Sequence, residues 1–175
     1  MNEELLARIA QAVASGIRCE SPSAAAKSAP MVCGNSISLE KARLLIAAVE
    51  KRAAQLGVNA VVAVADRAGR PVAIECMDNS YIASFDVALK KSYTVVALKM
   101  PTITLKPLAQ PGESLYGIQF TNDGQIVVFG GGDPLVYNGE IIGGLGVSGG
   151  TEDQDTELSA YGAACLAKIM EGESI

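Results

Sequence analysis

The pattern of hydrophobic and polar positions divides the chain into three parts. In residues 1–17 apolar side chains recur at helical spacing and form one stripe: Leu5, Leu6, Ile9 and Val13. Residues 18–35 show no such period and are rich in Ala, Ser and Pro, which is typical of a tether. We therefore predict an amphipathic helix over 1–17, a tether over 18–35 and one globular domain over 36–175.

Within the domain, the pattern predicts three helices and five strands. One helix begins after Ser38 and ends near Gly57, a second covers 82–100, and a third follows a capping box at 151–154. Strands are expected over 61–65, 72–76, 126–129, 135–137 and from 140 to about 148. Residues 100–117 are rich in proline and are expected to be largely irregular. Strands joined mostly by hairpins indicate an α/β (α+β) fold with one five-stranded antiparallel sheet packed against helices.

Composition excludes several functional classes. The 175 residues are 49% hydrophobic and 19% charged, so the chain can bury a core. Its net charge of −5 argues against binding to the phosphate backbone of nucleic acids. The chain has no histidine, which excludes a Ser-His-Asp triad and histidine-ligated zinc or heme.

The cysteines and the apolar runs indicate an intracellular protein. Cys19, Cys33, Cys76 and Cys165 are widely spaced and form no C-x-x-C pair, so four free thiols are expected. No apolar run approaches the ~20 residues needed to span a bilayer. We therefore expect a soluble cytoplasmic protein with no membrane partner.

The glycines are concentrated in one part of the chain, and two interpretations of them remain open. Twelve of the 18 glycines lie between Gly112 and Gly150. Glycine permits tight turns and close backbone packing, or it can form the floor of a shallow ligand groove, here at residues 130–132. The G-x-G-x-x-G string at 144–149 does not indicate a dinucleotide site, because only one helix follows it and that helix begins with acidic residues.

The sequence shows candidate acid–base groups but no complete catalytic set. Asp66 fits a turn, Asp86 and Lys90 fit a solvated pair, and Asp78 follows a strand and faces either a loop or a pocket. Lys91 and Tyr93 have no partner in the sequence, so a pocket role is one interpretation. Cys76 and Met77 are soft ligands suited to iron, but adjacent strand residues point to opposite faces. Cys165 lies on the apolar stripe of the last helix and fits the core.

Several short motifs occur in the order known from one family. They are SLEKA (38–42), VADRAG (64–69), MD (77–78), AS (83–84), KSYT (91–94), QPG (110–112), LYG (115–117) and GVSGGTEDQD (146–155). With these motifs, the chain from Ser38 to the last helix resembles the GlcG/HbpS heme-binding family, which includes the C-terminal domain of PduO. The resemblance implies a profilin-like fold, assembly into dimers or larger rings up to octamers, and heme or another tetrapyrrole, such as a corrinoid, as ligand. We expect no adenosyltransferase activity.

The candidate site residues follow from the motifs and from the absence of histidine. The residues predicted to form a ligand pocket are Asp78, Ser84, Lys91, Tyr93, Tyr116, Gly131 and Gly132. The candidate ligands of a heme iron are Cys76, Met77, Tyr93 and Lys91. No residue is assigned a catalytic role, and no metal other than heme iron is expected.

The N-terminal pattern completes the functional hypothesis. The segment 1–17 and its tether resemble an encapsulation peptide, which would dock on shell or cargo proteins of a bacterial microcompartment through Leu5, Leu6, Ile9 and Val13. The first hypothesis is therefore an oligomeric heme-binding accessory protein in the lumen of a microcompartment for diol or related catabolism. One alternative is an enzyme that acts on a small carbonyl or hydroxy-acid through Lys91 and Tyr93. The other is a structural adaptor between cargo and shell.

Overall fold

A computed structural model describes residues 35–173, which form one sheet with helices on both faces. The helices are α2 (Leu39–Gln55), α3 (Ile82–Leu98), α4 (Thr102–Leu108) and α5 (Glu152–Glu171), with short 3₁₀ turns at Ile118–Phe120 and Asn122–Gly124. The strands are β1 (Val61–Asp66), β2 (Pro71–Cys76), β3 (Gly132–Tyr137) and β4 (Glu140–Ser148). The mixed α/β fold class expected from the sequence is confirmed.

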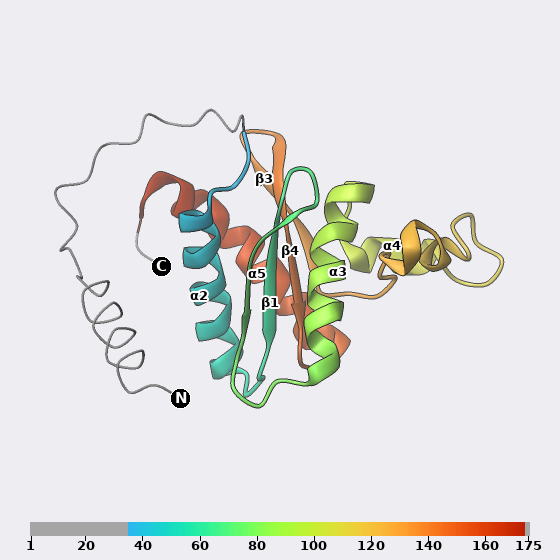
Figure 1. The fold of residues 1–175 in the computed structure, drawn as a ribbon, viewed down its shortest axis with the longest axis horizontal. Coiled ribbons are helices and arrows are strands. Elements are labelled where there is room, and N and C mark those ends of the chain that lie inside the picture. Colours follow the sequence, from blue (N-terminus) through green and yellow to red (C-terminus); the bar gives the residue numbers. More distant parts are fainter. Residues whose placement is uncertain (1–34, 174–175) are drawn as a thin grey trace, which may run out of the picture. The chain divides into compact units, whose positions relative to one another are not determined.

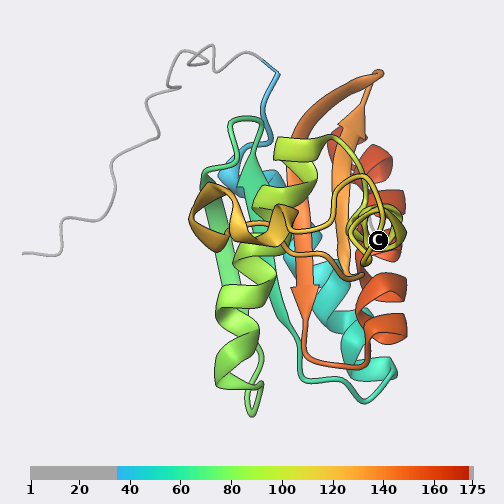
Figure 2. The ribbon, with the colours of Figure 1, turned by 90° about the vertical axis from the view of Figure 1, so that its right-hand side faces the viewer.

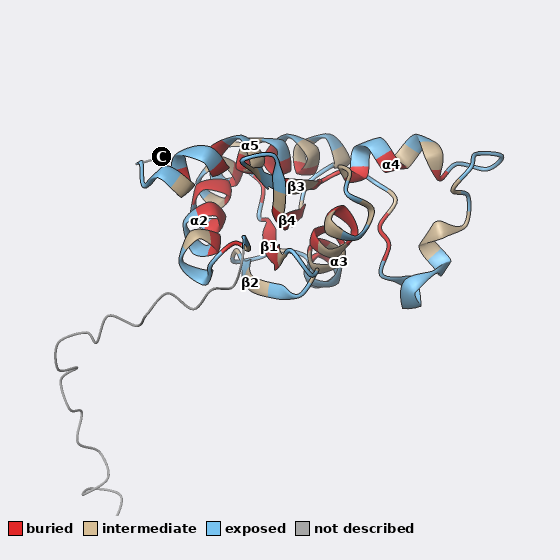
Figure 3. Ribbon diagram, turned by 90° about the horizontal axis from the view of Figure 1, so that it is seen from above, coloured by how far each residue is buried: buried red, intermediate tan, exposed pale blue. Residues whose placement is uncertain are grey.

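The four strands form an antiparallel sheet in the order β2-β1-β4-β3. Helices α2 and α5 cover one face and α3 covers the other (Figures 1 and 3). Strand β1 supplies both cores because its side chains alternate: Val62 and Val64 pack with α2 and α5, whereas Val61 and Ala63 pack with Ala88 of α3. The sheet is therefore buried on both faces in its centre.

Glycines of β4 allow α3 to lie very close to the sheet. A Cβ atom at Gly144 would stand 2.2 Å from the Ser92 carbonyl oxygen, and one at Gly146 would stand 2.1 Å from that of Ala88. Any larger residue would push the helix away from the strand. Close packing of backbone, rather than a phosphate-binding loop, accounts for the G-x-G-x-x-G string.

Local sequence signals account for the starts of two helices and for one turn. The Ser38 hydroxyl accepts the Lys41 N–H at the start of α2, and Thr151 and Gln154 form the predicted capping box of α5. The Asp66 carboxylate accepts the N–H groups of Ala68 and Arg70, which confirms its turn role. By contrast, Asp86 is exposed and forms no ion pair with Lys90 among the described residues.

The prediction of five strands was wrong, because residues 126–129 do not join the sheet. The Val127 N–H donates to the Thr94 hydroxyl of α3 at 3.0 Å, and that hydroxyl shares its proton between the Lys90 carbonyl at 2.7 Å and the Gln125 carbonyl at 3.2 Å. The backbone of this segment therefore forms hydrogen bonds with a helix side chain instead of with a neighbouring strand. Ile126 and Val127 are still buried, which explains the strand-like apolar pattern.

The segment 100–117 is more ordered than predicted, since it contains helix α4. Pro101 stands at the N-cap, where a missing N–H costs nothing, and Pro107 lies in the last turn. The segment between α3 and β3 lies outside α3, on the side away from α2 (Figures 1 and 2). It is the one long connection of the described fold.

Three further expectations concern residues at the N-terminus, the cysteines and the membrane. The helix over 1–17 and most of the tether lie outside the described residues, as do Cys19 and Cys33. Cys76 and Cys165 are free cysteines, the first exposed and the second buried. Among the described residues, no helix is long and apolar enough to cross a membrane.

Candidate functional site

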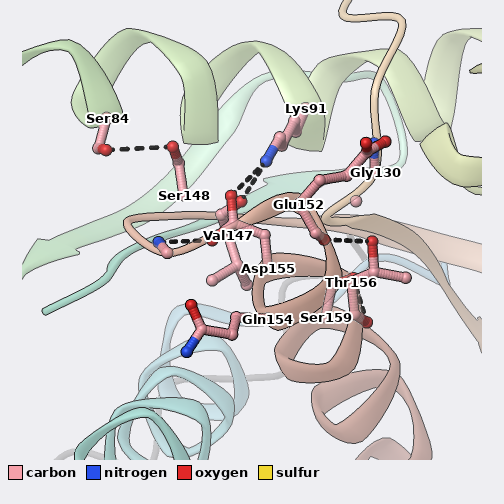
Figure 4. Close-up of polar contacts among 12 residues, drawn as sticks. Ser84, Lys91, Gly130, Val147, Ser148, Glu152, Gln154, Asp155, Thr156 and Ser159 are labelled. Carbon is pink, nitrogen blue, oxygen red and sulfur yellow. Dashed lines mark hydrogen bonds and ion pairs between the residues drawn. The ribbon is translucent and has the colours of Figure 1, made fainter. Parts of the chain in front are cut away.

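The side chain of Lys91 is the largest one that the described fold buries completely, with 0% of its surface exposed. It extends from α3 to the end of β4, where its Nζ donates to the Val147 carbonyl at 2.7 Å (Figure 4). The same Nζ forms an ion pair with Asp155 of α5, 2.8 Å from Oδ2. One side chain thus joins a helix on each face of the sheet to the strand between them.

The Lys91 side chain has room to reach Val147 because two neighbouring residues are glycines, which have no side chain. A Cβ at Gly131 would stand 2.5 Å from Lys91 Nζ, and one at Gly146 would stand 3.0 Å from Lys91 Cβ. The chain turns at Gly131 with a φ of 107°, a conformation that favours glycine, just before β3 begins. The Val147 N–H donates to the Gly131 carbonyl at 2.8 Å, while the Val147 carbonyl is satisfied by the lysine.

Both members of the ion pair make a further contact that holds them in place. Asp155 Oδ1 accepts the Gly150 N–H at 2.9 Å, so both carboxylate oxygens are occupied. The Phe129 ring lies over the amine, with its centroid 4.9 Å from Nζ, at a distance typical of a cation–π contact. The charge is therefore enclosed by Asp155, a carbonyl and an aromatic ring.

Burial lowers the pKa of Lys91, and the nearby Asp155 carboxylate opposes that effect by favouring the charged form. A lowered lysine pKa is often found at reactive sites, but a general base or nucleophile must also reach its substrate. In this fold Nζ is buried with its partners. The arrangement is therefore suited to hold elements together rather than to act on a substrate.

A second carboxylate fixes the loop above the ion pair. Glu152 accepts the Gly130 N–H at 2.8 Å through Oε1, and its other oxygen accepts a hydrogen bond from Lys106 of α4. The Gly130 hydrogen bond, followed by that from Lys106, lowers the pKa of Glu152. The start of α5 thus anchors both α4 and the glycine loop, which is residues 130–132.

The structure brings together only some of the residues predicted to form a pocket. Lys91, Gly131 and Gly132 do meet, but all three are buried, and Thr102, Val95 and Asp155 occupy the space that glycine leaves. The glycine loop is thus packed against α3, α4 and α5 and is not an open groove floor. In the described residues, the backbone-packing interpretation of these glycines fits better than the groove.

The other predicted pocket residues lie elsewhere. Ser84 is buried and pairs with Ser148 at 3.1 Å (Figure 4). Asp78 and Tyr116 are exposed. The Tyr93 ring packs against Gly69, and its hydroxyl accepts a weak hydrogen bond from Asn122 at 3.4 Å. Lys91 and Tyr93 therefore face different neighbours, so the geometry does not support a joint acid–base role.

Asp155, the partner of Lys91, was not among the site residues predicted from the sequence. It is one of three acids in the first turn of α5, where the helix dipole favours negative charge. Its position three residues before Leu158 and seven before Gly162 places it on the buried face of α5. That periodicity was the available signal that the carboxylate is internal and needs a buried partner.

Of the four candidate iron ligands, Cys76 is the most accessible. Lys91 is held in its ion pair, and Met77 is half-buried with its sulfur 3.3 Å from the Ala60 N–H that it accepts. Cys76 is exposed at the end of β2, opposite Val61, on an edge of the sheet. Among the described residues, no three His, Cys, Asp or Glu side chains cluster in a way that would hold a metal ion.

Exposed apolar side chains follow Cys76 along the chain. After a turn closed by the Ser80 N–H and the Met77 carbonyl, Tyr81 and Ile82 expose 72% and 96% of their surface, and Phe85 is also exposed. These three residues are called the α3 apolar patch below. Exposed patches of large apolar side chains are typical of surfaces that bind a ligand or another protein.

Comparison with known proteins assigns the chain. The family model described as "Haem degrading protein HbpS-like" matches residues 37–164. The chain belongs to the HbpS-like family. A 15.0 kDa protein of Citrobacter freundii, from the dhaT-dhaS intergenic region, is 40% identical to this HbpS-like chain over 134 residues, which cover 77% of the chain and 94% of the relative.

Two further relatives connect the HbpS-like chain with PduO. The corrinoid adenosyltransferase PduO of Salmonella typhimurium is 37% identical over 131 residues, which cover 75% of the chain but only 39% of PduO. The crystal structure of a PduOC:heme complex superposes with a TM-score of 0.71 at 37% identity, covering 74% of this chain and 94% of the other. The similarity to PduO therefore concerns a minor part of that enzyme.

Proposed function

We propose that this HbpS-like chain is a heme-binding accessory protein. The observation that carries the proposal is its similarity, at 37% identity over 94% of the other chain, to a PduOC domain whose crystal structure contains heme. The family model, with its reference to heme, supports the same ligand. The closed environment of Lys91 and the separation of Lys91 from Tyr93 favour binding over catalysis.

The side chains available in this chain fit a sulfur-ligated heme on the surface. The chain has no histidine, and Cys76 is an exposed thiol five residues before the α3 apolar patch in the sequence. Cysteine thiolate is an established axial ligand of heme iron, and an apolar surface suits the porphyrin ring. We propose that Cys76 supplies the ligand and that Tyr81, Ile82 and Phe85 contact the ring.

A hemin titration of the purified protein, followed by the Soret band, tests this proposal. The native chain should give a saturable shift with one heme per chain. Cys76→Ala should weaken affinity by at least about tenfold, the scale of losses seen when even outer partners of a metal site are removed. Cys165→Ala is the matched control, because it removes the buried thiol of α5 and should leave the spectrum unchanged.

Two outcomes would contradict the proposal at different levels. A broad, linear rise in absorbance with no saturation would exclude specific heme binding. A saturable shift that Cys76→Ala leaves unchanged would retain heme binding but exclude the thiolate ligand. Phe85→Ser would then show whether the α3 apolar patch contributes to the site.

We further propose that the chain self-associates, in assemblies from dimers to octamers, and works inside a bacterial microcompartment. Residues 1–17 would dock on shell or cargo proteins through their apolar stripe, residues 18–35 would be the tether, and residues 36–175 the heme-binding module. The support is the amphipathic pattern of the segment together with the similarity of the domain to part of PduO.

A further inference from the structure

A pocket of about 420 Å³ lies at the end of the sheet where β4 leads into α5. Three connections line it: the one between α2 and β1, the one between β2 and α3, and the one between β4 and α5. Its polar and aromatic lining comes from Asn59, Asn79, Tyr81, Thr151 and Gln154. The volume falls within the ~300–1,000 Å³ of typical small-molecule sites.

Part of the hydrogen-bonding capacity in this pocket is not used by the fold. The side chains of Asn59 and Asn79 form no hydrogen bond with another described residue, and both are exposed. Gln154 uses Oε1 to accept the Thr151 N–H at 2.9 Å, which leaves the two protons of its amide nitrogen available. The pocket therefore offers several donors and acceptors from neutral carboxamides.

The charges around the pocket exclude ions as the natural occupant. None of the residues that line it is charged. Two backbone N–H groups at the start of α5 are occupied, since that of Gly150 donates to Asp155 and that of Gln154 donates to Thr151. Glu152 and Asp153 follow directly and would repel an anion. Sites for divalent cations usually include carboxylates, and no carboxylate lines this pocket.

We propose that this pocket binds a small neutral molecule with several hydroxyl groups, such as a monosaccharide or a shorter polyol. Hydroxyl groups both donate and accept, and carboxamides match them on both counts. The exposed ring of Tyr81 supplies an apolar surface for the C–H face of such a molecule. The pocket shares Tyr81 with the α3 apolar patch, but its carboxamides and Thr151 belong to the pocket alone, so the proposal does not depend on heme.

The test is a titration of the heme-free full chain with D-glucose and with glycerol, followed by the amide resonances of Gly149, Gly150 and Thr151 in two-dimensional NMR. At least one of the two probes should give saturable shifts confined to the pocket. Gluconate and glycerol 3-phosphate, which add a negative charge to the same skeletons, should give none. Asn59→Ala and Tyr81→Ala should each weaken binding by about tenfold, the effect of losing 1.4 kcal/mol of contact free energy.

Gln125→Ala is the control, because it removes an exposed carboxamide distant in sequence from the pocket. Asn79 is retained in all variants, since its φ of 64° favours asparagine and a substitution would strain the loop. The proposal is overturned if neither neutral probe saturates, if the charged analogues bind equally well, or if Asn59→Ala binds as the native chain does. Hemin binding is measured separately, so its failure would leave this result unaffected.

Discussion

At the residue scale, the ion pair of Lys91 and Asp155 is the most consequential contact in the described fold. The two charges are shielded from water and neutralise each other, and the Val147 carbonyl and the Gly150 N–H each serve one of them. Removal of one partner leaves the other charge buried and uncompensated, which costs far more than the pair contributes. Their effect on stability should therefore be strongly non-additive.

Lys91→Met should lower the free energy of unfolding by about 3–5 kcal/mol, because it strands the Asp155 carboxylate in the interior. The double variant Lys91→Met, Asp155→Asn should recover a large part of that loss, since asparagine still accepts the Gly150 N–H without carrying a charge. Chemical denaturation of both variants measures the difference. A Lys91→Met protein that is as stable as the native chain would show that the buried pair contributes little.

The pH dependence of stability can be predicted from Glu152. Its pKa in the folded protein is lowered below the ordinary value of 4.5 by the Gly130 N–H and by Lys106, so the ionised form stabilises the fold at pH values above that ordinary value. This stabilisation is lost as the pH falls through the lowered folded pKa. Because the side chain is partly exposed, the contribution should not exceed about 1 kcal/mol.

Glu152→Gln should therefore lose less stability than the native chain as the pH falls below the ordinary value of 4.5 and through the lowered pKa of the folded protein. Urea denaturation at a series of pH values measures the two slopes. Glu113→Gln is the control, since Glu113 is exposed and its carboxylate has no hydrogen-bond partner among the described residues. Equal slopes for the native chain and Glu152→Gln would contradict the prediction.

At the scale of elements, the glycine loop decides how three helices meet the end of the sheet. Gly131 combines a positive φ with close contacts, whereas Gly112 has a φ of 90° and no atom within 4 Å of the point that a Cβ would occupy. Both positions favour glycine for conformational reasons, but only Gly131 lacks space. Comparison of the two separates backbone strain from close packing.

Gly131→Ala should destabilise the fold by at least about 2 kcal/mol more than Gly112→Ala, because the new methyl group would collide with Lys91 Nζ and the Val147 carbonyl. Thermal and urea unfolding of the two variants give the comparison. Similar losses in both would show that the loop moves aside and that the ion pair tolerates the displacement.

At the scale of the whole molecule, the core of the described residues runs from Ile37 to Ile169. If residues 1–34 act only as the proposed docking segment and tether, their deletion should change the melting temperature by less than about 2 °C, the effect of a fraction of a kcal/mol. Hemin affinity should also remain. Association with co-expressed microcompartment shells, measured by co-purification, should be lost.

A pair of charge variants sharpens this test. Ile9→Glu places a charge on the apolar stripe, whereas Gln11→Glu places the same charge off the stripe. Only the first should abolish association with shells. Equal association of the native chain, the deletion and Ile9→Glu would remove the docking role proposed for the segment.

Signals that act over a few residues allowed much of this fold to be predicted from the sequence. Ser38, the capping box at 151–154 and the Asn138-Gly139 turn each satisfy or bend backbone within one turn of chain, so their effect does not depend on distant residues. The absence of histidine likewise limits the chemistry of any metal site, whatever the fold. Cys76 was among the candidate ligands for the same reason.

The tertiary structure alone decided the features that depend on contacts between distant residues. Lys91 and Asp155 are 64 positions apart in the sequence. Thr94 forms hydrogen bonds with the backbone of residues 125–127, which are more than 30 positions away. A local pattern cannot state which partner a buried lysine will find or which donor will satisfy an apolar stretch, because those choices are made when helices and strands pack. The sequence by itself determined where several helices and turns begin and that no histidine is available for chemistry. Packing determined that neighbouring side chains fill the space around the glycine loop, that Lys91 is enclosed and that the Cys76 thiol remains exposed.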